Sequence, residues 1–221
     1  MDSNRKIAVI VGVLFIIATV STLVSVVFVE SIYNPAYLTA VSANENQVLI
    51  GVLLWLTAIA SIVSIPIMIY PILKKQSESL ALGYVGARIF EGLFFAINII
   101  ILLSILSLSR EFVSATSPVV SYFETSGSLL LAEFDWNSIL LDFPFVLSAL
   151  ILNYVLYKSK LIPRWLSGWG FIGGVLYLPE ILLGMFGLTD PTILFAALGI
   201  QEMALAAWLI AKGFNSSTIT P

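Results

Sequence analysis

An arginine and a glutamate lie deep inside a long apolar stretch of this chain. Residues 80–108, LALGYVGARIFEGLFFAINIIILLSILSL, are long and apolar enough to cross a bilayer, and they contain Arg88 and Glu91. At about 1.5 Å of rise per helical residue, these side chains lie roughly 12 and 16 Å from the Leu80 end, near the centre of a ~30 Å hydrocarbon layer. Charged residues at that depth are costly, and they typically mark a functional site.

Further polar residues are spaced so that they can join this pair. Spacings of four, three and seven residues place four polar side chains on one face of the helix: Tyr84, Arg88, Glu91 and Asn98. In the last apolar segment, Glu202 lies about 15 Å deep, at the height of Arg88 and Glu91. We therefore predict a polar cluster between the third and sixth apolar segments, made of Arg88, Glu91, Glu202, Tyr84 and Asn98.

A second set of polar residues lies nearer the other membrane face. Asp142 and Glu180 fall in the outer third of the fourth and fifth segments, and each stands beside a proline, Pro144 or Pro179. A proline inside a helix frees the carbonyl four residues earlier, and freed carbonyls with carboxylates can form a cation site. Together with Tyr177, these two acids are the candidate outer site, with a simple helix kink as the alternative.

Acids outnumber bases inside the apolar segments. Arg88 faces four carboxylates there: Glu91, Asp142, Glu180 and Glu202. At roughly 2.5–3.5 kcal/mol for each unpaired charge near the membrane centre, the surplus acids must be protonated, hydrated or neutralised by a bound cation. Two interpretations follow. The cluster is a site for a proton, a small cation or an anionic lipid headgroup, or it is a structural ion-pair knot that fixes the helix register.

The composition narrows the class of protein. Of the 221 residues, 59% are hydrophobic and 10% are charged, which is typical of a membrane protein. The net charge of −3 provides no electrostatic basis for a nucleic-acid partner. Because the chain has no Cys and no His, thiol nucleophiles, imidazole-bound zinc or haem and Ser-His catalysis are excluded. We expect no cofactor and no metal site, and we favour a role other than catalysis.

The elements that must position these residues are six apolar segments. We predict an all-α polytopic integral membrane protein with six transmembrane helices in a single domain, residues 1–214, followed by a disordered polar tail, residues 215–221. The stretch Arg110–Trp136 is expected to form a loop or a short amphipathic cap on the membrane surface. The predicted spans are Ile7–Val29, Gln47–Leu73, Leu80–Leu108, Asn137–Tyr157, Arg164–Gly187 and Thr192–Lys212.

Basic residues fall on one side of this six-helix weave. The opposite loops contain several acids and only one base, Arg110. Because positively charged loops stay in the cytoplasm, we predict that both termini are cytoplasmic. The basic residues on the predicted cytoplasmic side are Arg5, Lys6, Lys74, Lys75, Lys158, Lys160, Arg164 and Lys212.

Three stretches resemble a known family. They are ALGYVGARIFEG at 81–92, LYKSKLIPRWLSGWGFIGGVLYL at 156–178 and QEMALAAWLIAKGF at 201–214. These stretches resemble the prokaryotic multi-pass membrane family called domain of unknown function 4386, over nearly the whole chain. The resemblance implies a six-helix protein of the prokaryotic cytoplasmic membrane, and it brings no established activity. It assigns shared features to Arg88, Glu91, Ser159, Pro163, Arg164, Glu202, Trp208, Lys212 and Gly213.

Two functional hypotheses from different classes follow. In the first, the protein handles a proton or small cation as a carrier or coupled module, with Glu91 and Glu202 as titrating acids and Arg88 as the charge that tunes them. In the second, it is a non-catalytic assembly or interaction subunit whose cluster is structural. A lipid-processing enzyme that uses only carboxylates ranks third. The expected partners are the lipid bilayer and a proton, a small cation or a lipid headgroup.

Overall fold

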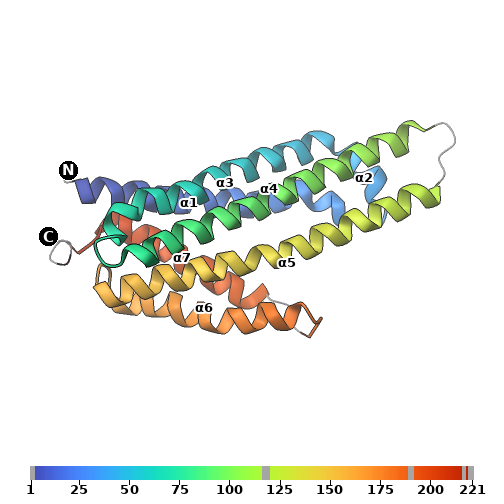
Figure 1. Ribbon diagram of the computed structural model, residues 1–221. Helices are drawn as coiled ribbons and strands as arrows, with labels where there is room; N and C mark the ends of the chain where they lie inside the picture. Colours follow the sequence, from blue (N-terminus) through green and yellow to red (C-terminus); the bar gives the residue numbers. More distant parts are fainter. Residues whose placement is uncertain (1–2, 116–119, 189–191, 216–217, 219–221) are drawn as a thin grey trace.

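The computed structural model describes residues 3–115, 120–188, 192–215 and 218, and all regular secondary structure in these ranges is helical (Figure 1). Among the described residues, six helices are long and apolar enough to span a membrane, as the sequence predicted. The two short elements, η1 and α2, lie between the first two of these. In chain order the elements are α1 Ser3–Val29, η1 Glu30–Tyr33, α2 Tyr37–Ala43, α3 Glu45–Leu73, α4 Glu78–Ser114, α5 Val120–Ser159, α6 Arg164–Gly184 and α7 Thr192–Ala211.

The six long helices form a closed ring. Each packs against the next in the order α1, α3, α4, α5, α6 and α7, and α7 returns to α1. The two chain ends lie at the same end of this ring (Figure 1). We call it the basic end because the predicted cytoplasmic residues all belong to the helix ends and turns there: Arg5, Lys6, Lys74, Lys75, Lys158, Lys160, Arg164 and Lys212.

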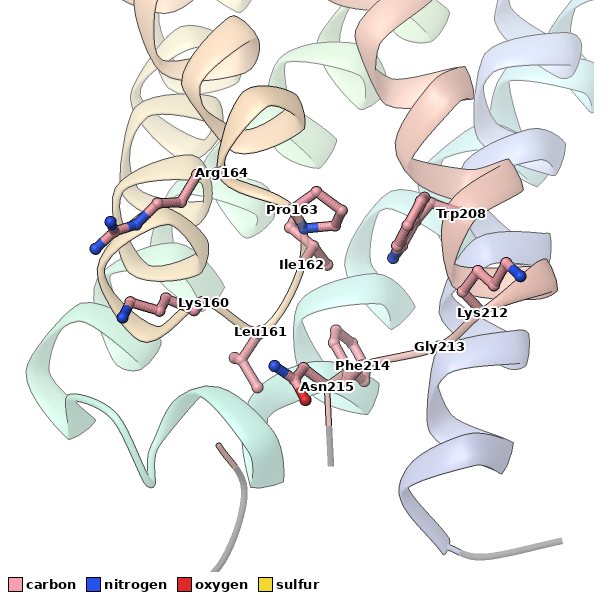
Figure 2. Close-up of a pocket in the computed structure, with 10 residues that line it drawn as sticks. All are labelled: Lys160, Leu161, Ile162, Pro163, Arg164, Trp208, Lys212, Gly213, Phe214 and Asn215. Atoms are coloured by element: carbon pink, nitrogen blue, oxygen red, sulfur yellow. The ribbon is translucent and has the colours of Figure 1, made fainter. Parts of the chain in front are cut away.

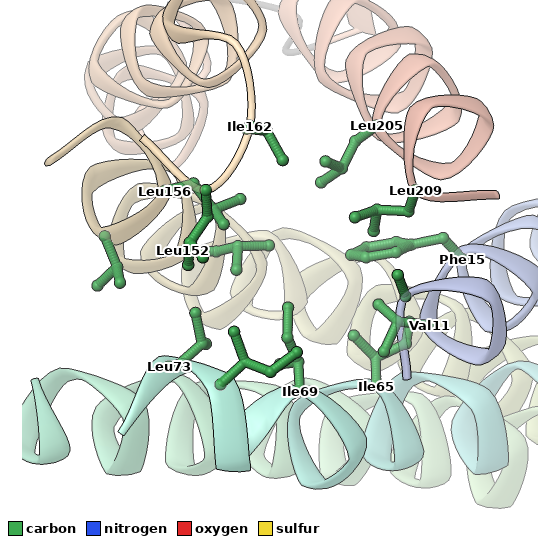
Figure 3. Close-up of a cluster of buried hydrophobic side chains, with 14 of the residues drawn as sticks. Val11, Phe15, Ile65, Ile69, Leu73, Leu152, Leu156, Ile162, Leu205 and Leu209 are labelled. Carbon is green, nitrogen blue, oxygen red and sulfur yellow. The ribbon is translucent and has the colours of Figure 1, made fainter. Parts of the chain in front are cut away.

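Apolar side chains fill the ring interior near the basic end. Figure 3 shows Phe15 of α1, Ile69 of α3, Leu152 of α5 and Leu209 of α7 converging in one cluster. All four are almost fully buried. In lipid the backbone N–H and C=O groups must bond to each other, so each apolar segment forms its own helix. Contacts between side chains then decide how the helices pack.

At the other end of the ring, the sequence prediction for the segment between the third and fourth spans was wrong. We expected the stretch Arg110–Trp136 to be loop or surface cap, but α4 continues to Ser114 and α5 already begins at Val120. At 40 residues, α5 is about 60 Å long, twice the thickness of a hydrocarbon layer. In Figure 1, α4 and α5 accordingly run past the ends of α6 and α7.

Packing explains why α5 stays helical through a stretch with turn-like composition. Gly127 is buried because the Tyr37 ring of α2 lies directly against it, in space that a side chain would occupy. The hydroxyls of Thr125 and Ser128 donate to helix carbonyls at 2.7 and 2.9 Å, so they are satisfied within the helix. Beneath this region the Trp55 ring of α3 stacks on Phe134, with 6.0 Å between ring centroids.

The predicted polar tail is described only in part. Asn215 donates its backbone N–H to the Leu161 carbonyl at 2.8 Å, and the Thr218 carbonyl accepts from the Gln76 amide at 3.2 Å. The other residues of the tail, 216–217 and 219–221, lie outside the described residues. The prediction that the tail is disordered therefore stays a prediction for those positions.

Close approach of α1 and α7 depends on one glycine. A Cβ at Gly12 would lie 2.7 Å from Cγ1 of Ile210 and 2.8 Å from the Ala206 carbonyl oxygen. Backbone cannot move away as a side-chain end can, so we expect Gly12→Ala to lower the free energy of unfolding by roughly 1–3 kcal/mol. Thermal denaturation in detergent measures the change. The matched control is Gly86→Ala on α4, where no atom lies within 4 Å of the added Cβ and stability should not fall. Equal melting temperatures for the two variants would contradict this packing.

Candidate functional site

Arg88 of α4 lies inside the ring with its guanidinium bound to two carboxylates. Its Nη1 donates to both oxygens of Glu91, at 3.2 and 3.1 Å. Its Nη2 donates to Oε1 of Glu202 at 2.5 Å. Only 2% of the Arg88 surface is exposed. One guanidinium therefore serves an acid one turn further along its own helix and an acid from α7.

The bond to Glu202 crosses the interior of the ring. α4 packs between α3 and α5, whereas α7 packs between α6 and α1, so the two helices are not neighbours in the ring. Arg88 and Glu202 meet only because both side chains point inward at the same height. The predicted meeting of the third and sixth spans at Arg88, Glu91 and Glu202 is therefore present in the structure.

Aromatic rings surround the guanidinium on its remaining sides. The Arg88 Cζ atom lies 5.6 Å from the ring centroid of Phe15 on α1, 5.7 Å from that of Tyr84 and 5.8 Å from that of Phe145 on α5. Cation–π attraction at these distances stabilises a desolvated cation. Arg88 thus contacts side chains from α1, α4, α5 and α7, and Tyr84 belongs to the cluster as predicted.

Some polar atoms of the cluster lack a hydrogen-bond partner among the described protein atoms. They are the Tyr84 hydroxyl and Nε of Arg88, both of them buried. Buried polar groups are normally satisfied by protein or by ordered water. Both groups are therefore left to an ordered water molecule.

Gln201 is a site residue that the sequence reasoning missed. It is fully buried, and its amide donates to Oδ1 of Asn153 at 3.2 Å and to the Leu166 carbonyl at 3.3 Å. Asn153 in turn donates to the Ala149 carbonyl at 2.9 Å. The sequence did offer a signal for it, since Gln201 is an uncharged polar residue directly before Glu202 in an otherwise apolar helix. Its side chain points toward α5 and α6.

Asn98 lies apart from the charged cluster. Its amide donates to the Ser138 hydroxyl at 3.2 Å, and its carbonyl oxygen accepts from Asn137 at 2.7 Å. Asn137 also donates to the Phe94 carbonyl at 2.8 Å. Asn98 shares the inward face of α4 as predicted, but it joins α4 to α5 about two turns beyond Glu91 and does not contact the guanidinium.

The three residues of the predicted outer site are neighbours. Tyr177 is fully buried, and its hydroxyl interacts electrostatically with Asp142 and Glu180 while lying outside hydrogen-bonding geometry with Asp142. Asp142 is also close enough to Glu91 for their charges to interact. Asp142, which the sequence analysis assigned to the outer site, therefore also interacts electrostatically with the central cluster.

Within the described residues, the central cluster carries more acid than base. Arg88 is matched against the two carboxylates that it binds, and Asp142 adds a third nearby. If every group is ionised, the cluster holds a surplus of negative charge in the interior of the ring. Adding a proton to one carboxylate removes part of that surplus.

Comparison with known families places the chain. A family model described as domain of unknown function 4386 matches residues 10–213, almost the entire chain. The chain belongs to this family. The resemblance drawn from the motifs of the sequence is thereby confirmed. Comparisons with curated proteins and with solved structures found no match.

The residues to which the sequence resemblance assigned shared features fall at two places in the fold. Arg88, Glu91 and Glu202 form the central cluster. The others gather at the basic end, where Ser159 lines one pocket and the rest line another: Pro163, Arg164, Trp208, Lys212 and Gly213. Neither of these two pockets includes a residue of the charged cluster.

Removing the buried cation should be far more costly than removing an exposed one. We expect Arg88→Met to lower the free energy of unfolding by about 3–5 kcal/mol, because Glu91 and Glu202 are left facing each other without a counter-charge. The matched control is Arg110→Met, which breaks an ion pair with Glu45 that is open to solvent. Denaturant titration in detergent compares the two.

A charge-free variant completes this test. Replacing Arg88 by Met and both acids by Gln removes the two carboxylates that Arg88 binds together with their counter-charge, so stability should recover much of the loss seen with Arg88→Met alone. If Arg88→Met were no more costly than Arg110→Met, the buried ion pairs would not hold the ring together.

Proposed function

We propose that the cluster of Arg88, Glu91, Glu202 and Tyr84 binds and releases a proton within the membrane, as part of a carrier or of a proton-coupled module. The observation that carries this proposal is the sharing of one buried guanidinium between Glu91 and Glu202. One cation neutralises one carboxylate. Protonation of the second carboxylate is then favoured, because an unpaired negative charge inside the membrane is costly.

The immediate surroundings support a proton over a metal ion. The Arg88 guanidinium occupies the space between the two carboxylates, so a metal ion entering there would meet a fixed positive charge. A proton needs only one carboxylate oxygen and no coordination shell. Asp142 adds negative charge near Glu91, which strengthens the attraction for a proton.

Glu202 is the acid best placed to exchange that proton. Its side chain is 13% exposed, compared with 4% for Glu91. Glu91 is held by both of its oxygens on Arg88, whereas Arg88 bonds to Glu202 through a single oxygen. In this proposal Glu91 and Glu202 share the proton, Glu202 is the more exposed of the two, and Arg88 sets the strength of binding.

We infer that the protein lies in the prokaryotic cytoplasmic membrane with its basic end in the cytoplasm. Lys and Arg gather at the end of the ring that carries both termini, and the opposite end is rich in exposed acids. The positive-inside rule supports this orientation. It would expose the long ends of α4 and α5 on the other face of the membrane.

Infrared spectroscopy of the protein in lipid nanodiscs tests the proton site. At neutral pH we expect a carbonyl band from at least one protonated carboxylic acid per chain, because one guanidinium cannot balance the carboxylates around it. Glu202→Gln should remove or shift this band. Raising the pH should then cause none of the band loss that is expected for the wild-type protein. The control, Glu133→Gln, removes an exposed carboxylate and should leave the band unchanged.

Two results would overturn the proton proposal. One is a wild-type spectrum without a carboxylic acid band at any pH at which the protein is folded. The other is proton uptake in proteoliposomes, followed with a pH-sensitive dye, that is the same for Glu202→Gln as for wild type. Either would favour the second function, a non-catalytic assembly subunit with a structural ion-pair clamp, which the complete burial of Arg88 between four helices supports.

Cysteine labelling tests the proposed orientation against a clean background, since the chain has no Cys. We expect Glu124→Cys at the start of α5 to react with a membrane-impermeant maleimide on intact cells. Lys75→Cys, between α3 and α4, should react only after the cells are permeabilised. Both positions are exposed. The reverse labelling pattern would place the basic end outside the cell.

A further inference from the structure

Apolar side chains close the charged cluster toward the basic end. The core shown in Figure 3 lies between the cluster and that end, and each of its buried members except Tyr84 is apolar. A pocket of about 470 Å³ opens at the basic end between the α5–α6 turn and the end of α7 (Figure 2). The pocket stops at the core, because Leu161 and Ile162 belong to both. A proton that enters from this side therefore meets only apolar surface.

Ionisable side chains lead from the cluster in the opposite direction. Their depth follows from the number of residues that separate each from the end of its helix at the basic end, at about 1.5 Å a residue. Successive levels are about 5 Å apart, a gap that one hydrogen-bonded water molecule spans. The levels are about 15 Å for Glu202 and Arg88, about 20 Å for Glu91 and Tyr177, and about 25 Å for Glu180 and Asp142.

Tyr177 lies between the two outermost acids. Its side chain is fully buried, and its ring packs against Phe145 and Phe195, at 6.5 and 6.3 Å between centroids. Its hydroxyl interacts electrostatically with Asp142 and Glu180, and it has no hydrogen-bond partner among the described protein atoms. A proton on either acid supplies that partner, because a protonated carboxyl group donates to the hydroxyl and the hydroxyl donates to the other carboxylate.

The two acids extend this arrangement to the cluster and to the end of α6. Asp142 is close enough to Glu91 for their charges to interact. Phe145, one turn further along α5, lies 5.8 Å from Cζ of Arg88, so this part of α5 borders the cluster. Glu180 is partly exposed and lies one turn before the last residue of α6. The series therefore runs from the ring interior to the helix end opposite the basic end.

We propose that the cluster exchanges its proton with the membrane face opposite the basic end through three relay residues, Glu180, Tyr177 and Asp142. A proton on Glu180 passes to the Tyr177 oxygen while the hydroxyl proton moves to Asp142, so the tyrosine is unchanged after each transfer. Asp142 then gives the proton to Glu91. This route rests on the proposed proton site, and it adds the side of the membrane to which that site opens.

Proton–deuteron exchange of the protein in nanodiscs tests the route. After rapid mixing with D₂O buffer, the carboxylic acid band that responds to Glu202→Gln shifts as its proton is replaced, and the rate of this shift measures exchange. We expect Tyr177→Phe to slow the shift by roughly a hundredfold, because the relay oxygen is absent, and to leave the band intensity before mixing unchanged. The matched control, Tyr154→Phe, removes an exposed hydroxyl of α5 near the basic end and should exchange like wild type.

A second variant makes the test independent of the first. Glu180→Gln should also slow the shift, and melting temperatures establish that the variants are folded. If the band is present and both variants exchange as fast as wild type, the route is wrong and the proton site stands. Equal slowing by Tyr154→Phe would also overturn the route, since that hydroxyl lies outside the series. A wild-type protein without the band would refute the proton site and the route with it.

Discussion

The structure depends on one guanidinium that four helices enclose. Burial of Arg88 in a membrane is costly unless opposite charge and polarizable surface surround it, and here two carboxylates and three aromatic rings do so. These partners come from α1, α4, α5 and α7. Any arrangement that separates them leaves a charge in hydrocarbon, so the position of Arg88 restricts how the whole ring can close.

The ring around this centre is held by contacts that require small side chains. Gly12 lets α1 lie directly on the backbone of α7, and Gly170 of α6 lies against the Asn153 side chain of α5. Lipid offers no hydrophobic driving force between helices, so close packing and hydrogen bonds must supply it. The bond from Gln201 to Asn153 adds a polar link between α7 and α5 beside the charged cluster. Packing thus joins neighbours in the ring, α1 with α7 and α5 with α6, whereas these polar contacts join helices across it, α4 with α7 and α5 with α7.

Sequence alone predicted six membrane-spanning helices and the equal height of Arg88 and Glu202, because both follow from helix rise and hydropathy. Residues at equal depth on inward faces, such as Arg88 and Glu202, were therefore expected to meet. Residues whose partners lie on another helix were harder to place. Asn98 was assigned to the cluster by its helical face, but it bonds to Asn137 and Ser138 because these amide and hydroxyl groups face it from α5.

The length of α5 was missed for a different reason. Serine, threonine and glycine near the start of α5 give this segment a composition typical of loops. Packing of Gly127 against Tyr37 nevertheless favours a helix there. The depth of Asp142 had been counted from the predicted start of the span, Asn137. The helix continues well beyond that point, and Phe145, one turn further along it, contacts Arg88, so Asp142 lies nearer the central cluster than its outer assignment suggested.

α7 is the element common to the charged cluster and the pocket at the basic end. It carries Glu202 toward the ring interior, and Trp208 lies six residues later on the wall of the pocket, about 9 Å along the helix. Its ring neighbours are α1 and α6, and Arg5 of α1 holds its last carbonyls. A helix tied at one end by Arg5 and at its middle by Arg88 cannot shift along its axis without changing both contacts.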